Sequence, residues 1–394
     1  MSLIRRLFRD PFRAPAGPAG GPGKWTLLAL LLGAGAYVVF RSVRAELVDF
    51  EVYRTAAARV LEAQPLFRLD DGHYQYKYLP AFSFLVVPFA AMPKALAEIL
   101  WFAVTVGLAS VFVWMSIQTV PERRTPDDRL IWIGLLLTGK FLVKEIGFGQ
   151  TNILFGIVLL SAMLAAQRGR HVTAGVLAGV GVFVKPYAVV FLPWVVWMSG
   201  AIALAAFLGA AAIGLLIPVP IYGWTGNLDL LRGWYEVVTT STAHTLLGHE
   251  NISFASMWAK WWAPQAAPLA LAAVTSAAGL ALVGAAVARR RHAVGPACVE
   301  YGMLAILVPL ISPQGWDYLL VMALPGYLCL VDRWKETPWP WRAAMCAGLF
   351  VTSFAIFDVM RRPLYMFVMN SGIPTLGALA LLACLLRLRW RGLA

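Results

Sequence analysis

Val48-Asp49-Phe50-Glu51-Val52-Tyr53 is the stretch around which the fold of this chain is organised. It follows the first long apolar run, at about residues 25–40, and so lies where the chain should leave a bilayer. The chain around it is 60% hydrophobic and only 13% charged, with a mean hydropathy of +0.71. A carboxylate at the membrane face of such a chain is a candidate for chemistry, which makes Asp49 the first residue to consider.

The apolar runs predict the fold class. Successive runs of membrane-spanning length follow one another along the 394 residues, which predicts an all-α, polytopic membrane protein. We expect about 12 transmembrane helices, one short re-entrant or additional helix, and external interfacial helices, the first of them over residues 46–63. The net charge of +13 reflects basic residues gathered in the predicted cytoplasmic segments, so no nucleic-acid partner is expected.

The chain divides into a tail and one membrane domain. Residues 1–24 are expected to form a basic cytoplasmic tail, and residues 25–391 a single integral membrane domain. No cleavable signal peptide is evident, so the first apolar run is expected to remain as a helix. With the tail inside, the long polar segments at residues 41–78 and 223–262 become external loops. These features fit a bacterial inner (plasma) membrane.

The number of spans leaves two topologies open. About thirteen runs would cross if all of them spanned, yet two basic ends on the same side require an even number. In the preferred topology the short run Leu79 to Pro93 is re-entrant, which keeps Arg168 and Arg170 inside. The alternative joins the half-length runs on either side of Lys185 into one bent helix and places both arginines outside.

In the preferred topology the polar interruptions of the apolar runs converge on the outer membrane face. One site at the lipid–water boundary would account for them, because an unpaired charge at the bilayer centre costs roughly 2.5–3.5 kcal/mol. The interruptions are Asp49, residues 76–80, residues 145–152, Lys185, Glu250-Asn251 and residues 312–317.

Asp49 and three lysines suggest the chemistry. A carboxylate at the interface can take the proton of an alcohol acceptor as a general base. Lys185 stands between two apolar runs and, alone or together with Lys140 or Lys144, suits the neutralisation of a phosphate. Two other interpretations stay open: Asp49 balances a neighbouring arginine on a helix surface, and Lys140 and Lys144 extend toward the membrane face.

No metal or cofactor site is predicted. His244 and His249 are five residues apart in a polar segment and do not form a helical metal-binding pair. A metal held by Asp49 and Glu250 is the alternative that stays open. The four cysteines are expected to pack as small apolar side chains rather than form a disulfide or bind metal: Cys298, Cys329, Cys346 and Cys384.

A series of short motifs resembles glycosyltransferase family 87. The motifs are spread over about residues 45–330, and each is weak alone, but their order along the chain is fairly specific. They are Asp49-x-x-x-Tyr53, Gln64-Pro65-Leu66-Phe67, Tyr76-x-Tyr78-x-Pro80, Gly149-Gln150-x-Asn152, Ala174-Gly175-x-x-x-Gly179 through Lys185-Pro186, Glu250-Asn251-x-Ser253 and Ser312-Pro313-x-x-Trp316.

The resemblance implies a membrane hexosyltransferase of the GT-C type that uses a polyprenyl-phosphate-linked sugar donor. The family includes α-mannosyltransferases, so the resemblance favours mannose as the sugar and a lipid or glycan as the acceptor, with membrane lipids as further partners. We expect the transfer to invert the anomeric configuration. With the preferred topology, the site is expected to face the periplasm or the cell exterior. Asp49 matches the acidic residue of the family's first external loop and would act as the base.

The other motifs would hold the substrates. Lys185, with Lys140 or Lys144, would bind the donor phosphate. The side chains expected to contact the sugar or the lipid headgroup are Tyr53, Tyr76, Tyr78, Gln150, Asn152, Glu250, Asn251, Ser253, Trp316 and Asp317. Asp317 stands where members of the family often carry a histidine, which puts a histidine role at this place in doubt.

A transporter or lipid flippase is the main alternative, because broken helices and buried lysines also occur in such proteins. The long external segments favour an enzyme with its site on one face, whereas a flippase would keep its polar residues near the midplane. A non-catalytic membrane scaffold is a third interpretation, and the buried position expected for Lys185 argues against it.

Overall fold

The chain is all-helical in the part that the computed structural model describes, which is residues 35, 47–72, 74–262, 267–289 and 297–392. A single isolated bridge, between Asn251 and Trp316, is the extent of β-type pairing within those residues. The expected basic tail at residues 1–24 lies outside the described residues, as does nearly all of the first expected helix, at residues 25–40.

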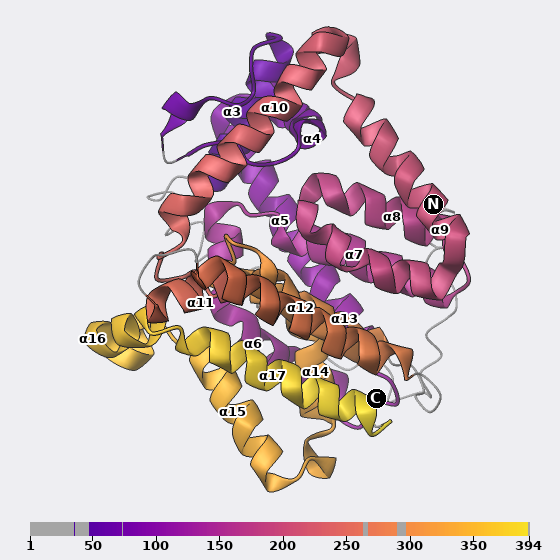
Figure 1. The fold of residues 1–394 in the computed structure, drawn as a ribbon, viewed down its shortest axis with the longest axis vertical. Coiled ribbons are helices and arrows are strands. Elements are labelled where there is room, and N and C mark those ends of the chain that lie inside the picture. The colour runs from indigo at the N-terminus through magenta and orange to yellow at the C-terminus, as the bar shows by residue number, and fades with distance from the viewer. Residues whose placement is uncertain (1–34, 36–46, 73, 263–266, 290–296, 393–394) are drawn as a thin grey trace.

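Helices of very different length make up the fold (Figure 1). The α-helices of the N-terminal half are α3 (Val48–Leu61), α4 (Pro80–Ala90), α5 (Lys94–Thr119), α6 (Asp127–Phe148), α7 (Asn152–Gln167), α8 (His171–Val184) and α9 (Leu192–Leu216). They are followed by α10 (Val219–Thr245), α11 (Phe254–Trp261), α12 (Ala267–Ala288), α13 (Ala297–Ile311), α14 (Leu324–Asp332), α15 (Trp339–Ser353), α16 (Phe357–Asn370) and α17 (Ile373–Trp390). Two 3-10 segments matter for the site, η2 (Pro186–Val190) and η4 (Asp317–Ala323).

The predicted count of about 12 spans is not confirmed. By length and composition, four described helices can cross a membrane, namely α5, α9, α12 and α17. The number rises to six if the bent pairs α6–α7 and α15–α16 each form one span. Helices α4, α8 and α13 are apolar but have only 11, 14 and 15 residues. At about 1.5 Å per residue they are shorter than the roughly 30 Å of a hydrocarbon core.

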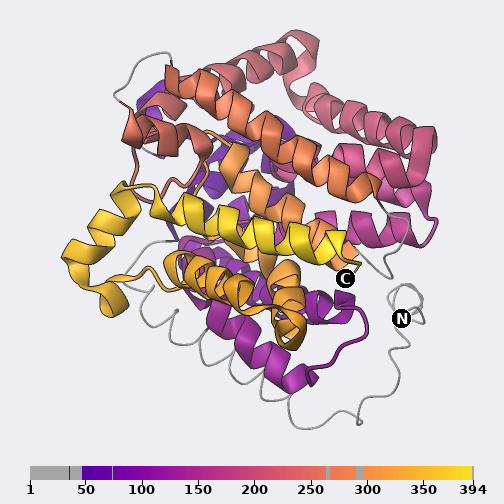
Figure 2. The same cartoon turned by 60° about the horizontal axis from the view of Figure 1, so that its bottom comes forward.

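The helices that carry the N-terminal motifs gather at one end of the molecule. Figure 1 shows α10 crossing over α3 and α4 there, while α15 lies at the opposite end. Helices α12, α13 and α17 pack side by side through the middle of the chain's C-terminal half (Figure 2). Helix α16 projects from the edge of the molecule in both views and turns by 92° from α15.

Helix α3 confirms the helix expected over residues 46–63. Asp49 and Glu51 lie in its first turn, where carboxylates interact favourably with the helix dipole. Leu61 is 56% exposed, whereas its neighbour Val60 points into the protein. The buried face consists of Phe50, Tyr53, Ala56, Ala57 and Val60.

Lys185 lies at a turn between two packed segments rather than in the middle of a span. Helix α8 ends just before it, and η2 leads the chain back along α8. Helix α9 is then interrupted at Gly200, where φ is +68°, and its second half packs against α8. Gly175 permits this approach, since a Cβ there would overlap the backbone carbonyl of Ala203.

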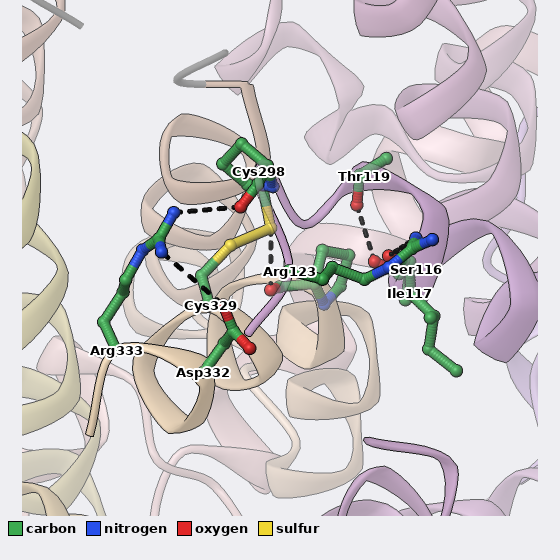
Figure 3. The surroundings of a disulfide bond; sticks show 10 residues. Ser116, Ile117, Thr119, Arg123, Cys298, Cys329, Asp332 and Arg333 are labelled. Atoms are coloured by element: carbon green, nitrogen blue, oxygen red, sulfur yellow. Dashed lines mark hydrogen bonds and ion pairs between the residues drawn. A yellow bond between two sulfur atoms is a disulfide. The ribbon is translucent and has the colours of Figure 1, made fainter. Parts of the chain in front are cut away.

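A disulfide joins Cys298 of α13 to Cys329 of α14 (Figure 3). The prediction that the cysteines only pack was therefore wrong for these two, while Cys346 and Cys384 are free thiols. Arg333 lies beside the disulfide and donates to a backbone carbonyl of the α5–α6 loop at 2.9 Å. The disulfide thus ties α13 to α14 close to the α5–α6 loop.

A buried polar cluster joins α9, α13 and α17 away from the N-terminal motifs. Arg389 Nε donates to Glu300 Oε1 at 2.9 Å, and Trp194 Nε1 donates to Glu300 Oε2 at 2.6 Å. Both members of this ion pair are buried. The C-terminal end of α17 is therefore anchored inside the protein through Arg389.

Candidate functional site

Asp49 is positioned by the packing of its neighbour in α3. Phe50 is fully buried, and its ring stacks on Trp101 of α5 with centroids 4.8 Å apart. Gly149, between α6 and α7, lies against Phe50 and has a φ of +71°, a conformation that favours glycine. A Cβ on Gly149 would be 2.8 Å from the Phe50 Cβ. The close approach of α3 to the α6–α7 break therefore depends on a glycine.

The α6–α7 break brings Gln150 to Asp49. The two helices meet at 116°, and Gln150 Nε2 donates to Asp49 Oδ2 at 2.6 Å. Fully buried Glu145 fixes the break from behind by accepting from Asn152 Nδ2 at 2.7 Å and from the Ile153 backbone N–H at 2.8 Å. These bonds satisfy donors at the start of α7. This break lies within the polar interruption expected at residues 145–152.

A row of hydroxyl groups continues from this break. The Tyr53 and Tyr78 hydroxyls are 2.8 Å apart, and the Tyr78 hydroxyl is 3.1 Å from Thr151 Oγ1. Lys185 Nζ lies 5.4 Å from the centre of the Tyr78 ring. Four segments therefore meet at Tyr78: α3, the loop before α4, the α6–α7 break and the turn between α8 and η2.

The protonation states near Asp49 follow from burial. Burial raises the pKa of Tyr53 well above its usual value, and the neighbouring Tyr78 and Asp49 raise it further, so Tyr53 remains a neutral hydroxyl. Burial also lowers the pKa of Lys77, and the charge of Asp49 partly offsets this effect. Asp49 is therefore within electrostatic range of a half-buried lysine.

Lys140 and Lys144 of α6 form ion pairs with carboxylates. Lys140 Nζ is 2.6 Å from Asp317 Oδ2, and Lys144 Nζ is 3.0 Å from Asp317 Oδ1 and 2.7 Å from Glu250 Oε1. Lys144 Nζ also lies 5.8 Å from the centre of the Tyr318 ring. Because two carboxylates balance the two lysines, this cluster presents little net charge to a phosphate. Phosphate binding by these lysines stays a prediction.

Asn251 and Ser253 shape the turn that carries Glu250. Asn251 Nδ2 donates to a backbone carbonyl of residues 312–316 at 2.8 Å, and Asn251 Oδ1 accepts from the Ser253 N–H at 3.0 Å. Ser253 Oγ caps the first turn of α11. Trp316 stacks nearly parallel on Tyr318, with centroids 6.4 Å apart. Sugar contacts from Asn251 or Ser253 stay predictions, since their side chains already bind backbone groups.

Tyr76 faces another part of α3. Its buried hydroxyl donates to the backbone carbonyl of Leu79 at 3.3 Å, and its ring packs against Phe67 and Tyr78. It also borders a cavity of about 200 Å³ that is lined by Val48, Glu51, Val52, Thr55, Arg59, Asp71 and Tyr74. Tyr76, one of the predicted site residues, therefore lines this cavity together with residues of α3.

Three residues of this constellation were not singled out by the sequence analysis. Lys77 lies between the two tyrosines of the Tyr-x-Tyr motif, Thr151 lies inside the Gly149–Asn152 motif, and Tyr318 follows Asp317. Each is a direct chain neighbour of a predicted residue. The motifs located the segments, whereas the contacts show which members of each segment meet.

The assembled groups suit proton transfer beside a polar substrate. A carboxylate lies among tyrosine hydroxyls, an amide and lysines, where it can accept a proton from a bound hydroxyl. No group of three or more His, Cys, Asp or Glu side chains that could hold a metal ion occurs among the residues that the structure describes.

Comparisons with known proteins agree with the sequence resemblance. The model of the family described as glycosyltransferase family 87 matches residues 76–313. The chain is also 22% identical over 389 residues to a polyprenol-phosphate-mannose-dependent alpha-(1-2)-phosphatidylinositol pentamannoside mannosyltransferase from Mycobacterium tuberculosis. That alignment covers 90% of this chain and 85% of the relative. No solved structure matches the chain.

Proposed function

Because this chain belongs to glycosyltransferase family 87, we propose that it transfers a hexose from a polyprenyl-phosphate sugar to an acceptor hydroxyl, with Asp49 as the general base. The family and the apolar helices make the chain a membrane glycosyltransferase. Mannose is the sugar that we propose, since the similar mycobacterial protein is a polyprenol-phosphate-mannose-dependent mannosyltransferase. A glycolipid acceptor is favoured for the same reason, because that relative acts on a phosphatidylinositol mannoside.

The proposed reaction is a single displacement. Asp49 takes the proton of the acceptor hydroxyl while the hydroxyl oxygen forms a bond to the anomeric carbon. The bond between the anomeric carbon and the phosphate oxygen breaks, and polyprenyl phosphate leaves with the bonding electrons. Attack from the face opposite the phosphate inverts the anomeric configuration. Asp49 ends the step protonated and returns its proton to solvent.

One observation carries this proposal: Asp49 lies where separate polar breaks of an apolar chain meet. It bonds Gln150 of the α6–α7 break and lies close to Tyr53, whose hydroxyl contacts Tyr78. Buried polar groups are costly, and their assembly around one carboxylate is typical of a functional site. The convergence supports an enzyme site at one membrane face, which we propose is the outer face of a bacterial inner membrane.

Lys185 is the cation that we propose for the donor phosphate. Within the described residues it makes no ion pair with a carboxylate at 4 Å or less, and its ammonium lies over Tyr78 at the centre of the site. Lys140 and Lys144 differ because they already pair with Asp317 and Glu250. We propose that these two lysines chiefly hold the acidic groups in place.

The proposed function is tested with purified protein in lipid nanodiscs. A panel of polyprenyl-phosphate sugars, including the mannose and glucose donors, is offered together with glycolipid acceptors from the host membrane. The expected result is release of polyprenyl phosphate matched by an equal amount of glycosylated acceptor. The configuration at the new linkage, measured by NMR, is expected to be opposite to that of the donor.

Two outcomes would contradict the proposal. In the first, no lipid-linked sugar is consumed while protein reconstituted in vesicles moves a lipid or solute, which would establish a transporter or flippase. In the second, the donor is consumed but the anomeric configuration is retained, which would exclude a single displacement assisted by Asp49.

A further inference from the structure

Two consecutive residues of α3 meet two consecutive residues of the α6–α7 break. Asp49 accepts a hydrogen bond from Gln150, while Phe50 packs against Gly149. The amide-to-carboxylate distance is 2.6 Å, and the Gln150 side chain is almost completely buried. The pairing therefore joins residues about a hundred positions apart in one fixed register.

The backbone around Gln150 is held on several sides. Its own N–H donates to the Glu145 carbonyl at 2.9 Å, and Trp101 Nε1 donates to the Gly149 carbonyl at 3.0 Å. The Thr151 side chain contacts the Tyr78 hydroxyl. Gln150 Nε2 also lies 3.4 Å from the Tyr318 hydroxyl. An amide fixed in this way can hold a carboxylate without moving itself.

We propose that Gln150 is a positioning residue that orients Asp49 and keeps it charged, rather than a contact for sugar hydroxyls. The proposal rests on the proposed function, in which Asp49 is the general base. A neutral amide N–H stabilises a carboxylate relative to the protonated acid, which matters beside buried apolar side chains that favour the acid. It also fixes Oδ2, so that the orientation of the carboxyl group toward the acceptor is set in advance.

Other titratable groups also surround Asp49 and influence its pKa in the wild type and in the variants alike. Tyr53 comes from α3, Lys77 from the loop before α4, and Tyr318 from η4, and each interacts electrostatically with Asp49. Lys144 of α6 lies beyond Tyr318 and is paired with Asp317 and Glu250. A substitution at position 150 leaves the contacts of Lys77 and Lys144 in place, but it removes the 3.4 Å hydrogen bond from Gln150 Nε2 to the Tyr318 hydroxyl.

The test is the pH dependence of kcat/KM for Gln150→Leu and Gln150→Glu. Without the amide donor, the acid limb of the Gln150→Leu profile is expected to move to higher pH by about one unit. Gln150→Glu keeps the side-chain length but places a second carboxyl group beside Asp49. Two carboxyl groups at this distance share a proton. The acid limb of the Gln150→Glu profile is therefore expected to move to higher pH by about two units or more.

Gln118→Leu is the matched control, since Gln118 lies at the far end of α5 near Arg123. Its profile is expected to coincide with that of the wild type. The Gln150→Glu variant also guards against misfolding of Gln150→Leu, because its side chain has nearly the same size and shape as glutamine.

The outcomes separate three roles of Gln150. An unmoved acid limb with a raised KM for donor or acceptor would overturn the proposal in favour of a sugar contact. An unmoved limb with a uniform loss of folded protein would leave only a structural role. Activity that survives in Asp49→Asn would contradict the proposed function itself. An inactive Asp49→Asn variant together with an unmoved Gln150→Leu profile would contradict only the role of Gln150 in positioning Asp49.

Discussion

Lys140 and Asp317 form the most enclosed ion pair of the site, with side chains 5% and 2% exposed. Lys140 also donates to the backbone carbonyl of Thr352 at 3.2 Å, and Lys144 provides a second positive charge to Asp317 at 3.0 Å. Such a pair adds little to stability compared with an apolar pair, but removal of one partner leaves an uncompensated charge. The two lysines and Asp317 therefore support η4 and Tyr318.

Lys140→Met is therefore expected to destabilise the protein by about 3 kcal/mol, because Asp317 loses its closest cation. The measurement is the thermal unfolding midpoint in detergent. Lys94→Met serves as the control, since Lys94 is half exposed and pairs with Glu51 and Glu98 at the surface. Its effect should stay below about 1 kcal/mol. Equal shifts in the two variants would contradict a supporting role for the buried pair.

Helix α3 meets the end of α6 at Gly149, and this contact sets the geometry of the site. Gly149→Ala is expected to cost about 1–3 kcal/mol, because the residue has a positive φ and the new methyl group would press on Phe50. The displaced Gln150 should also lower kcat at unchanged donor KM.

Gly139→Ala in the same α6 helix is the matched control, since nothing lies within 4 Å of a Cβ at that position beyond the helix itself. It should leave kcat unchanged and leave stability equal or slightly higher. A loss of activity as large in Gly139→Ala as in Gly149→Ala would show that the effect is not specific to the break.

Lys260 connects α11 to two other segments and predicts a pH dependence of stability. Its ammonium donates to the carbonyls of Asn251 and Met369 at 3.0 and 3.1 Å. Burial lowers the pKa of Lys260 from 10.5 to about 8. Between these two values the unfolded chain binds the proton and the folded chain does not, so the free energy of unfolding rises with pH. This contribution should be absent in Lys260→Met.

The measurement is the unfolding midpoint of both proteins from pH 7 to pH 10.5. Subtracting the Lys260→Met curve from the wild-type curve should leave a rise that begins near pH 8. A difference that is flat, or that falls with pH, would show that Lys260 keeps its ordinary proton affinity in the folded chain.

Sequence patterns predicted the long elements well and the broken ones poorly. The apolar runs at about residues 95–120, 130–146, 153–166 and 269–288 predict helices, and α5, α6, α7 and α12 lie within a few residues of these ranges. Helix α16 was not predicted, since Asp358, Arg361, Arg362 and Pro363 interrupt its apolar pattern. The predicted span count is not confirmed, because composition does not distinguish a short packed helix from one that crosses the membrane.

The sequence motifs predicted which residues belong to the site. They did not predict which of these residues form hydrogen bonds or ion pairs with one another. A motif identifies Gln150, but no local pattern shows that it bonds Asp49 or that Lys144 bonds Glu250. These contacts depend on the angle between α6 and α7 and on the fold of the segments around residues 250 and 317. Long-range pairing of this kind is a property of the tertiary structure.

The buried polar side chains form two separate clusters at different places in the molecule. The site gathers at the α3 end, where the breaks after α6, α8 and α13 meet, while Glu300 and Arg389 tie α13 to α17 elsewhere. Few polar side chains are surrounded by many apolar helices, which suits a substrate with a long hydrocarbon tail and a small charged head. In the proposed reaction, Asp49 is the sole proton acceptor.

The most direct measurement of that claim is the turnover rate of Asp49→Asn with a saturating polyprenyl-phosphate sugar, together with its affinity for the donor. Loss of the base is expected to lower kcat by on the order of 10²–10⁴-fold while donor affinity stays close to the wild-type value. Asp229→Asn, at an exposed ion pair on α10, should behave as the wild type. An Asp49→Asn variant that turns over within about tenfold of the wild type would contradict the account.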